Sequence, residues 1–372
     1  MRTLVVTNDF PPRPGGIQQF VHALASRLPP DEVVVYAPRW KRDALFDAEQ
    51  AFPVVRHPTT LMLPVPDVLK RAREIATAEG CDSVWFGAAA PLALLAKPLG
   101  LGVSVASTHG HEVGWAYLPG GRQVLRRIGA TTDVVTYLGA YTRHRLAPAL
   151  GPKATLARLP SGVDTDVFHP GAGREDVRRH LALADRPVVV CVSRLVPRKG
   201  QDVLIRALPA IRRDVPGAAL LVVGGGPDMP RLQRLAVEHG VADHVRFTGS
   251  VPWPELPAHY AAGDVFAMPC RSRLGGLEVE GLGIVYLEAA ATGLPVVAGD
   301  SGGAPDAVLD GETGVVVDGR DVDRVARETA ALLADPRRAA AMGARGRAWV
   351  EEAWRWDLLA ERLRALLRGE QP

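Results

Sequence analysis

Two permanent cations, Arg194 and Lys199, lie five residues apart. They follow the apolar run of residues 188–192, which is expected to form a buried strand. Arg194 offers a planar fork of N–H donors to phosphate oxygens, and Lys199 offers a point charge. The carboxyl edge of an open α/β sheet is where such folds bind ligands. The pair therefore predicts a phosphate site. The alternative is a solvated basic loop, the commoner fate of charged runs.

A second constellation consists of two glutamates and two glycines. Glu280 and Glu288 are separated by seven residues, Gly281 and Gly283 lie between them, and a helix is expected to begin near Ile284. Free amides at a helix N-terminus suit an oxyanion or a sugar hydroxyl. A carboxylate one turn further on can accept hydrogen bonds from a ribose diol. The plain alternative is a helix with the usual acidic bias at its start.

Two glycine turns follow strands and have different interpretations. Gly15-Gly16 comes after the first strand and allows close backbone approach to an anion, or makes a simple βα turn. Gly224-Gly225-Gly226 is not a dinucleotide fingerprint, because the third glycine of that motif would fall at Met229. This disfavours an oxidoreductase.

Histidines raise the question of a metal. His109, His111 and Glu112 lie after a strand, but their spacing is not that of a helical zinc motif. Asp164-Thr165-Asp166 is a short pattern that chance often supplies. We expect no metal site, and we expect His109 either to be structural or to face a ligand cleft as a polar contact.

Short β-branched runs alternate with helical patterns along the whole chain, as parallel sheets covered on both faces require. The pattern pauses at the Pro/Gly/Asp-rich stretch 159–171 and then restarts. We therefore expect an α/β protein with two doubly wound domains. The expected domains are residues 1–168 and 169–354. A C-terminal segment, about 355–372, carries apolar residues on one side at Leu358, Leu359, Leu363, Leu366 and Leu367.

Composition narrows the class further. The 372 residues are 47% hydrophobic and 23% charged with a net charge of +3, which suits a soluble globular protein and does not indicate nucleic acid. Three dispersed cysteines indicate neither a zinc site nor a disulfide framework, and a reducing cytosol fits best. The apolar run at the N-terminus is too short for a signal peptide, and no stretch is long enough to span a bilayer.

With these residues in order, the chain resembles the retaining GT-B glycosyltransferases of family 4. Gly15-Gly16, His109, the segment 161–168, Arg194 with Lys199, and the glutamate pair carry the resemblance. Ser161 departs from the asparagine usual in that family. The resemblance implies two facing Rossmann-like domains with a cleft between them, and a C-terminal helix that returns to the first domain.

The resemblance also implies roles for individual residues. Arg194 and Lys199 hold the donor diphosphate, with Gly16 near the phosphates, and Glu288 holds the ribose. Glu280 holds the sugar together with the segment Gly281, Leu282 and Gly283, and His109 lies near the sugar on the acceptor side. No cofactor is implied. The family's proposed same-face mechanism passes the acceptor's proton to the leaving phosphate.

Within that family, the longer stretches 6–13, 85–94, 107–115, 192–202 and 279–288 are similar to an actinobacterial branch. Members of this branch use GDP-mannose to add a second mannose, at the inositol 6-position, to a mannosylated phosphatidylinositol. Alternatives are a relative with another donor or acceptor, such as a UDP-sugar or a soluble acceptor, a sugar-nucleotide epimerase of the same architecture, and a binding protein without turnover.

A lipid acceptor implies a cytoplasmic enzyme that binds weakly to the inner, anionic face of the membrane. Two clusters suit this role. The first joins Trp115, Tyr117 and Leu118 to Arg122, Arg126 and Arg127. The second joins Leu61, Met62 and Leu63 to Lys70, Arg71 and Arg73. The alternative is that both are solvated faces of ordinary helices.

Overall fold

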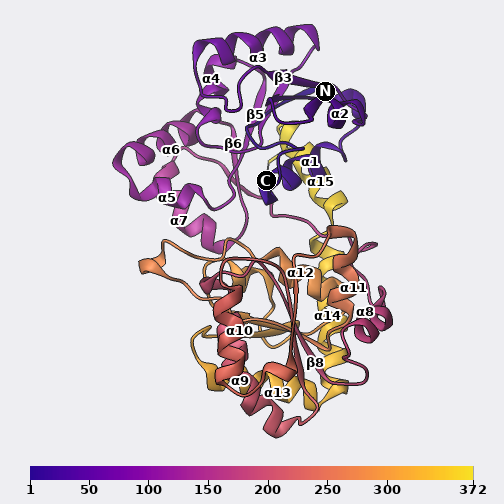
Figure 1. The fold of residues 1–372 in the computed structure, drawn as a ribbon. Coiled ribbons are helices and arrows are strands. Elements are labelled where there is room, and N and C mark those ends of the chain that lie inside the picture. Colours follow the sequence, from indigo (N-terminus) through magenta and orange to yellow (C-terminus); the bar gives the residue numbers. More distant parts are fainter. Residues whose placement is uncertain (372) are drawn as a thin grey trace. The chain divides into compact units, whose positions relative to one another are not determined.

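The computed structural model describes residues 1–371, which divide into two compact units (Figure 1). Unit 1 comprises Met1–Gly162 and the segment from Trp356 onward, and unit 2 comprises Val163–Arg355. The division therefore falls before Val163, whereas we expected it after Phe168. The reason is that the Phe168 ring packs edge-on against Tyr260 of unit 2, with 5.6 Å between ring centroids.

Unit 1 is built on a seven-stranded parallel sheet of order β3-β2-β1-β4-β5-β6-β7. Its strands are β1 (Thr3–Val6), β2 (Val33–Pro38), β3 (Val54–His57), β4 (Ser83–Phe86), β5 (Val103–Ser107), β6 (Val134–Tyr137) and β7 (Leu156–Arg158). Its helices before the domain crossing are α1 (Gly16–Ala25), α2 (Asp43–Ala48), α3 (Pro66–Ala78), α4 (Ala96–Leu99), α5 (Glu112–Tyr117), α6 (Pro119–Thr131) and α7 (Ala140–Leu150).

A hydrophobic core lies on each face of this sheet. Because successive side chains of a strand point to opposite faces, neighbouring residues of one strand enter different cores. Leu4 and Val6 of β1 belong to the core beneath α3, α6 and α7. Val5 belongs to the opposite core, beneath α1 and α15 (Trp356–Leu367). Continuous apolar strands are therefore required, and they explain the β-branched runs of the sequence.

Helix α15 lies beside α1 in unit 1, as the yellow ribbon of Figure 1 shows. Leu359, Leu363, Leu366 and Leu367 are buried in the core on that side of the sheet. The expectation for Leu358 is wrong. Its side chain remains 38% exposed, because it falls one position outside the stripe that the helical period turns toward the sheet.

Unit 2 repeats the design with a six-stranded parallel sheet of order β10-β9-β8-β11-β12-β13. Its strands are β8 (Val188–Val192), β9 (Ala219–Val223), β10 (Val245–Gly249), β11 (Val265–Met268), β12 (Val296–Gly299) and β13 (Gly314–Val317). Its helices are α8 (Arg174–His180), α9 (Gln201–Asp214), α10 (Met229–Glu238), α11 (Leu256–Ala261), α12 (Ile284–Ala291), α13 (Val322–Ala334) and α14 (Pro336–Ala353).

In each sheet the strand order reverses once, between β1 and β4 in unit 1 and between β8 and β11 in unit 2. Neighbouring loops diverge at such a point and leave room for a ligand at the carboxyl ends of the strands. The loops after β1, β4, β8 and β11 are therefore the places where each unit can build a site.

Candidate functional site

Lys199 and Glu280 meet in unit 2 at the strand-order reversal. Lys199 ends the short 3-10 helix η3 (Pro197–Lys199) after β8, and its Nζ lies 2.6 Å from Glu280 Oε2. The same oxygen accepts a hydrogen bond from Arg198 Nη1 at 2.7 Å. Lys199 and Glu280 are each only 8% exposed. The buried carboxylate thus has the partners that a buried charge needs, and two cations with one carboxylate leave the cluster with one net positive charge.

Arg194 occupies the same loop but a different environment. Its side chain is exposed and makes no hydrogen bond or ion pair with any of residues 1–371 that the structure describes, whereas its carbonyl accepts from Gln201 Nε2 at 3.2 Å. The guanidinium is therefore free to donate to an incoming oxyanion. The expected pairing of Arg194 with Lys199 did not anticipate that Arg198 shares the lysine's carboxylate.

The Glu280 loop is braced by a second glycine turn after β12, which sequence reasoning missed. Gly303 donates its N–H to the Glu280 carbonyl at 2.8 Å, and Ser301 Oγ accepts from the Glu280 amide at 3.3 Å. A Cβ at Gly302 would lie 2.1 Å from the Glu280 carbonyl oxygen. The signal was a Ser-Gly-Gly run directly after a strand at the carboxyl edge.

The segment Gly281–Gly283 leads directly into α12, as expected. Gly283 caps this helix with φ +79°, and a Cβ there would lie 2.5 Å from the ring of Tyr286. Leu282 is buried and anchors the turn. A glycine is therefore required at position 283, where only a backbone without a side chain fits, and the loop is held in one shape.

Glu288 lies on α12 about one turn beyond that loop and is half-buried. Tyr260 Oη donates a hydrogen bond to its Oε2 at 2.5 Å. Burial raises the pKa of Glu288 to about 7, although the bond from Tyr260 acts in the opposite direction. Tyr260 is a supporting residue that the sequence did not reveal, because no local pattern links α11 to α12.

Asp202, at the start of α9, connects the loop that carries Arg198 and Lys199 to the residues that follow β11. Its two carboxylate oxygens accept from Arg271 at 2.9 Å each, a bidentate pair. Arg271 in turn donates its backbone N–H to the Arg198 carbonyl at 2.9 Å. The position of the Arg198–Lys199 turn therefore depends on contacts that lie far apart in the sequence.

The glycines of residues 224–226 have a structural explanation. A Cβ at Gly224 would lie 2.1 Å from the Ser193 carbonyl oxygen, and one at Gly226 would lie 2.3 Å from that of Leu195. Gly225 accepts the Leu195 N–H at 2.9 Å. This turn packs against the Arg194 loop and supports it.

In unit 1, His109 follows β5 and its ring packs edge-on against Phe20 of α1, with 4.8 Å between centroids. His109 Nε2 hydrogen-bonds the Gly87 carbonyl at 2.6 Å, and the His109 amide donates to the fully buried carboxylate of Glu112 at 2.9 Å. Burial lowers the pKa of His109. The ring is therefore held neutral, with the Nε2 proton directed at a carbonyl.

Gly15 and Gly16 open α1 after β1. A Cβ at Gly15 would lie 2.1 Å from Gln18 Oε1, and the Gln18 amide donates to Asp9 Oδ1 at 2.7 Å. Gly16 is exposed at the first turn of the helix. Because Phe20 of the same helix contacts His109, the structure brings the glycine turn and the histidine to one region of unit 1.

The described part of the chain shows no group of three or more His, Cys, Asp or Glu side chains that could hold a metal ion. His109 and His111 stack face to face, with centroids 6.3 Å apart and an interplanar angle of 8°. Their rings therefore do not converge on one point as ligands must. Among residues 1–371, no helix combines the length and hydropathy that a bilayer crossing requires.

Comparison with known proteins identifies the family to which the two units correspond. The family model described as Glycosyltransferase Family 4 matches residues 14–167, and the model described as Glycosyl transferases group 1 matches residues 173–349. The crystal structure of Anabaena Alr3699/HepE in complex with UDP shares the fold, with a TM-score of 0.84, 19% identity and coverage of 99% of this chain and 100% of that one. The expected GT-B class with two Rossmann-like domains is confirmed.

Relatives of high identity cover nearly the whole chain. A GDP-mannose-dependent alpha-(1-6)-phosphatidylinositol monomannoside mannosyltransferase of Mycobacterium tuberculosis is 58% identical over 99% of this chain and 98% of its own length. The enzyme of that name from Mycolicibacterium smegmatis gives the same three values. A Corynebacterium glutamicum enzyme whose name specifies a monoacylated acceptor is 48% identical over 99% of this chain. The chain therefore belongs to the family 4 glycosyltransferases.

Proposed function

We propose that this chain is a retaining α-mannosyltransferase. It transfers mannose from GDP-mannose to the inositol 6-position of phosphatidylinositol monomannoside. The observation that carries the proposal is 58% identity over 99% of the chain to mannosyltransferases whose names state this donor and acceptor. The geometry of unit 2 supports it, because a charge cluster and a glycine-led helix lie at the strand-order reversal, where nucleotide ligands bind in such folds.

The chemistry assigned to unit 2 is stabilisation of the leaving group. The bond from the anomeric carbon to the diphosphate oxygen breaks, and negative charge develops on GDP. Arg194 donates to that charge from the solvent side and Lys199 from the buried side, where its contact with Glu280 holds the ammonium group in place. The bond from the anomeric carbon to the acceptor oxygen forms on the same face, and the acceptor's proton passes to the leaving phosphate.

The remaining residues position the reactants. Glu288 accepts hydrogen bonds from the ribose diol when it is ionised. Glu280 and the turn Gly281–Gly283 hold the mannose hydroxyls, with Leu282 as the buried anchor of the turn. In unit 1, Gly16 approaches the phosphates and neutral His109 offers a polar contact to the sugar.

The deciding experiment incubates the purified protein with labelled GDP-mannose and a set of defined acceptors, followed by linkage analysis of the product. Parallel reactions use UDP-N-acetylglucosamine as donor and inositol phosphate as a soluble acceptor. The proposal requires an α-(1-6)-linked dimannoside on the lipid and only background transfer elsewhere. Efficient use of a UDP-sugar, or epimerisation without transfer, would replace it with one of the alternatives.

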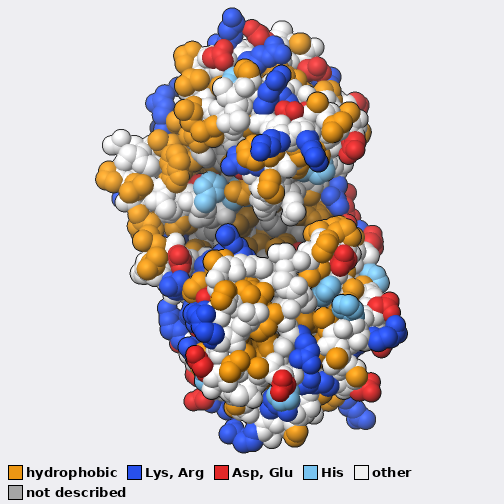
Figure 2. Space-filling model, viewed as in Figure 1, with side chains coloured by type: hydrophobic (Ala, Val, Ile, Leu, Met, Phe, Trp, Pro, Cys, Tyr) orange, Lys and Arg blue, Asp and Glu red, His pale blue; other side chains and the backbone are white. Residues whose placement is uncertain are grey.

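We also propose that the protein binds weakly to anionic membranes. Tyr117 is 57% and Leu118 63% exposed at the end of α5, and Arg122, Arg126 and Arg127 are exposed on α6. Figure 2 shows apolar side chains gathered over this part of unit 1. The second cluster needs one correction: Met62 is buried, because its backbone is fixed by Asn8 and its side chain joins the core, which leaves Leu61 and Leu63 exposed.

Each basic residue near an anionic surface contributes about 1 kcal/mol, so the attraction is weak and acts over about a Debye length. Sedimentation with neutral or phosphatidylinositol-rich vesicles tests it. Binding to the anionic vesicles at low salt and release at high salt are expected. Full recovery of the protein in the supernatant with the anionic vesicles at low salt would reject membrane binding.

A further inference from the structure

Unit 1 contains an apolar groove to which the mechanism above assigns no role. The groove has a volume of about 860 Å³ and lies between α3 and two consecutive helices, the 3-10 helix η2 (Leu92–Leu95) and α4. Its volume is within the range of roughly 300–1,000 Å³ that ligand sites occupy. The apolar residues that line it include Pro64, Val65, Pro66, Leu69, Leu94 and Leu95.

One face of α3 forms a wall along the whole groove. The lining residues of this helix begin at Pro66 and continue through Leu69, Arg73 and Thr77 to Ala78, at the spacing of a single helical face. A separate face, which includes Val68 and Ile75, packs into the core. The lining face spans about 18 Å at the rise of an α-helix. The length of this lining face suits an extended chain.

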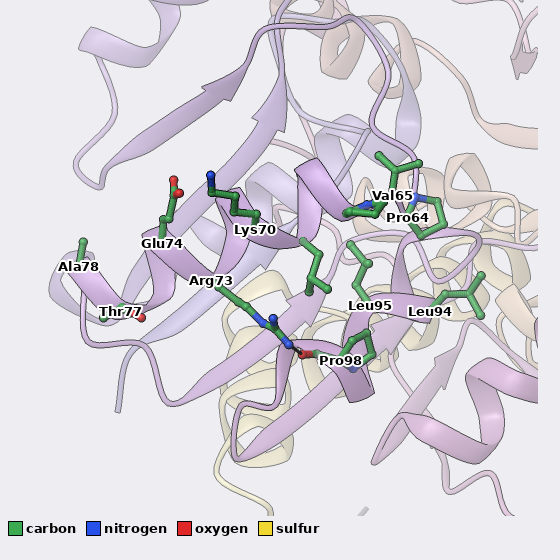
Figure 3. Close-up of a pocket in the computed structure, with 12 residues that line it drawn as sticks. Pro64, Val65, Lys70, Arg73, Glu74, Thr77, Ala78, Leu94, Leu95 and Pro98 are labelled. Atoms are coloured by element: carbon green, nitrogen blue, oxygen red, sulfur yellow. Dashed lines mark hydrogen bonds between the residues drawn. The ribbon is translucent and has the colours of Figure 1, made fainter.

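The charges around the groove favour an anionic amphiphile. Figure 3 shows Arg73 reaching across to the Pro98 carbonyl, which it hydrogen-bonds, while Lys70 and Glu74 extend from α3 on the other rim. Glu74 is neutralised by Arg71 at 3.0 Å. Lys70 is exposed and has no ion pair within the described residues. The rim therefore carries uncompensated positive charge beside an apolar floor.

One end of the groove begins at the edge where unit 1 builds its site. Asn8 follows β1, and its side chain exchanges two hydrogen bonds with the Met62 backbone, at 2.9 and 2.7 Å. Two residues beyond Met62, Pro64 and Val65 form the start of the groove. Helix η2 likewise follows β4, the other strand at the reversal of strand order. A lipid whose headgroup lies at this edge can reach the groove with its tail.

We propose that this groove binds one acyl chain of the phosphatidylinositol acceptor. The inference rests on the proposed function and adds a subsite to it. The inositol lies at the carboxyl edge of the unit 1 sheet, the phosphodiester lies near Lys70, and the chain runs along α3 toward Ala78. Each methylene that leaves water raises affinity roughly fourfold, so acceptors with longer chains should bind more tightly until the groove is full.

The test compares acceptors that carry butanoyl or palmitoyl chains, on the wild type and on Thr77→Trp. Thr77 is exposed at the far end of the groove, so an indole there shortens the groove without a core change. We expect the KM for the palmitoyl acceptor to rise about tenfold or more, while the KM values for the butanoyl acceptor and for GDP-mannose stay unchanged. Leu45→Trp is the matched control, since Leu45 is 70% exposed on α2 outside the groove.

A binding measurement without donor distinguishes the groove proposal from the proposed function. Displacement of a fluorescent fatty acid by palmitoyl lysophosphatidylinositol, without donor, should be weakened by Thr77→Trp and by Lys70→Gln but not by Leu45→Trp. The same chain-length dependence in the wild type and Thr77→Trp, with undiminished displacement, would overturn the groove assignment. A wild type that transfers mannose to no lipid would overturn the proposed function, and the displacement result would still decide the groove.

Discussion

The two units prepare their sites in opposite electrostatic ways. In unit 2, Lys199 and Arg198 both contact one carboxylate oxygen of Glu280, so the cluster keeps one net positive charge beside two nearly buried side chains, Lys199 and Glu280. In unit 1, burial lowers the pKa of His109 and keeps its ring neutral, although the hydrogen bond to the Gly87 carbonyl acts in the opposite direction. Fixed charges suit a ligand whose own charge changes in the reaction, while a neutral donor suits hydroxyl groups. The difference supports the proposal that the cations of unit 2 stabilise the charge of the leaving diphosphate and that His109 of unit 1 offers a neutral polar contact.

The largest effect should come from Lys199→Ala, which removes one preorganised cation. We expect turnover to fall roughly 10²–10³-fold, as for the loss of one donor that stabilises developing charge. Arg198 remains on Glu280 at 2.7 Å, so the carboxylate keeps a partner and the fold should persist.

Steady-state kinetics with GDP-mannose, alongside thermal unfolding, measures this effect. Lys153→Ala is the control, because Lys153 is an exposed lysine of unit 1. Turnover within threefold of the wild type, about 0.7 kcal/mol, would mean that charge in unit 2 is not the source of leaving-group stabilisation.

Glu288→Ala should act next most strongly, and on affinity rather than turnover. A hydrogen bond to a charged group contributes about 1.5–3 kcal/mol, so affinity for GDP should fall roughly 10- to 150-fold. Calorimetric titration with GDP measures it. Tyr260→Phe is the informative companion, because it removes the 2.5 Å bond to Glu288 but leaves the carboxylate in place. Unchanged affinity in Glu288→Ala would remove this residue from the donor site.

The pH dependence of stability should reveal Glu288 as well. Its pKa is raised from 4.5 to about 7, chiefly by burial, so the folded protein holds this proton more tightly than the unfolded chain does. The resulting stability is fully present below about pH 4.5 and is lost as the pH rises through about 7.

Denaturant unfolding of the donor-free protein across this interval provides the measurement. The free energy of unfolding should fall more steeply with pH in the wild type than in Glu288→Gln, which cannot titrate at that position. Parallel curves for the two proteins would show that Glu288 is ionised throughout, and its burial would then not control its charge.

The smallest expected effect is that of a chelator. Because the fixed cations of unit 2 are assigned the charge of the diphosphate, we expect activity to be unchanged by excess chelator. The assay is mannosyl transfer by dialysed protein with and without the chelator. Loss of activity that only a divalent ion restores would show that the cations of unit 2 do not act alone.

Much of the fold could be predicted from local patterns. The inner strands, such as β8 and β9, are continuous apolar runs because a parallel sheet buries both faces. The edge strands β3, β7 and β13 have weaker local signals. Two of them, β3 and β7, are short and partly exposed, and they carry Arg56 and Arg158, so their alternation is weak. β13 is mostly buried, but it follows a turn rather than a helix.

The features of the site can be separated in the same way, into those that local sequence predicts and those that only the fold creates. The sequence by itself determined the residue types and their spacing: a strand followed by two cations, and glycines that precede a helix with two glutamates. These are local features, since each lies within one βα unit and follows from backbone and helix chemistry. His109 was likewise apparent only as a residue that follows a strand.

Only the tertiary structure decided which partners these residues have. It brought Arg198 and Lys199 onto one oxygen of Glu280, 82 and 81 positions away respectively, and left Arg194 exposed. It gave Glu288 its bond from Tyr260 and buried Glu112 beneath the His109 loop. Charge state and burial depend on what packs around a group, and the order of strands in the sheets, which no local pattern encodes, determines those neighbours.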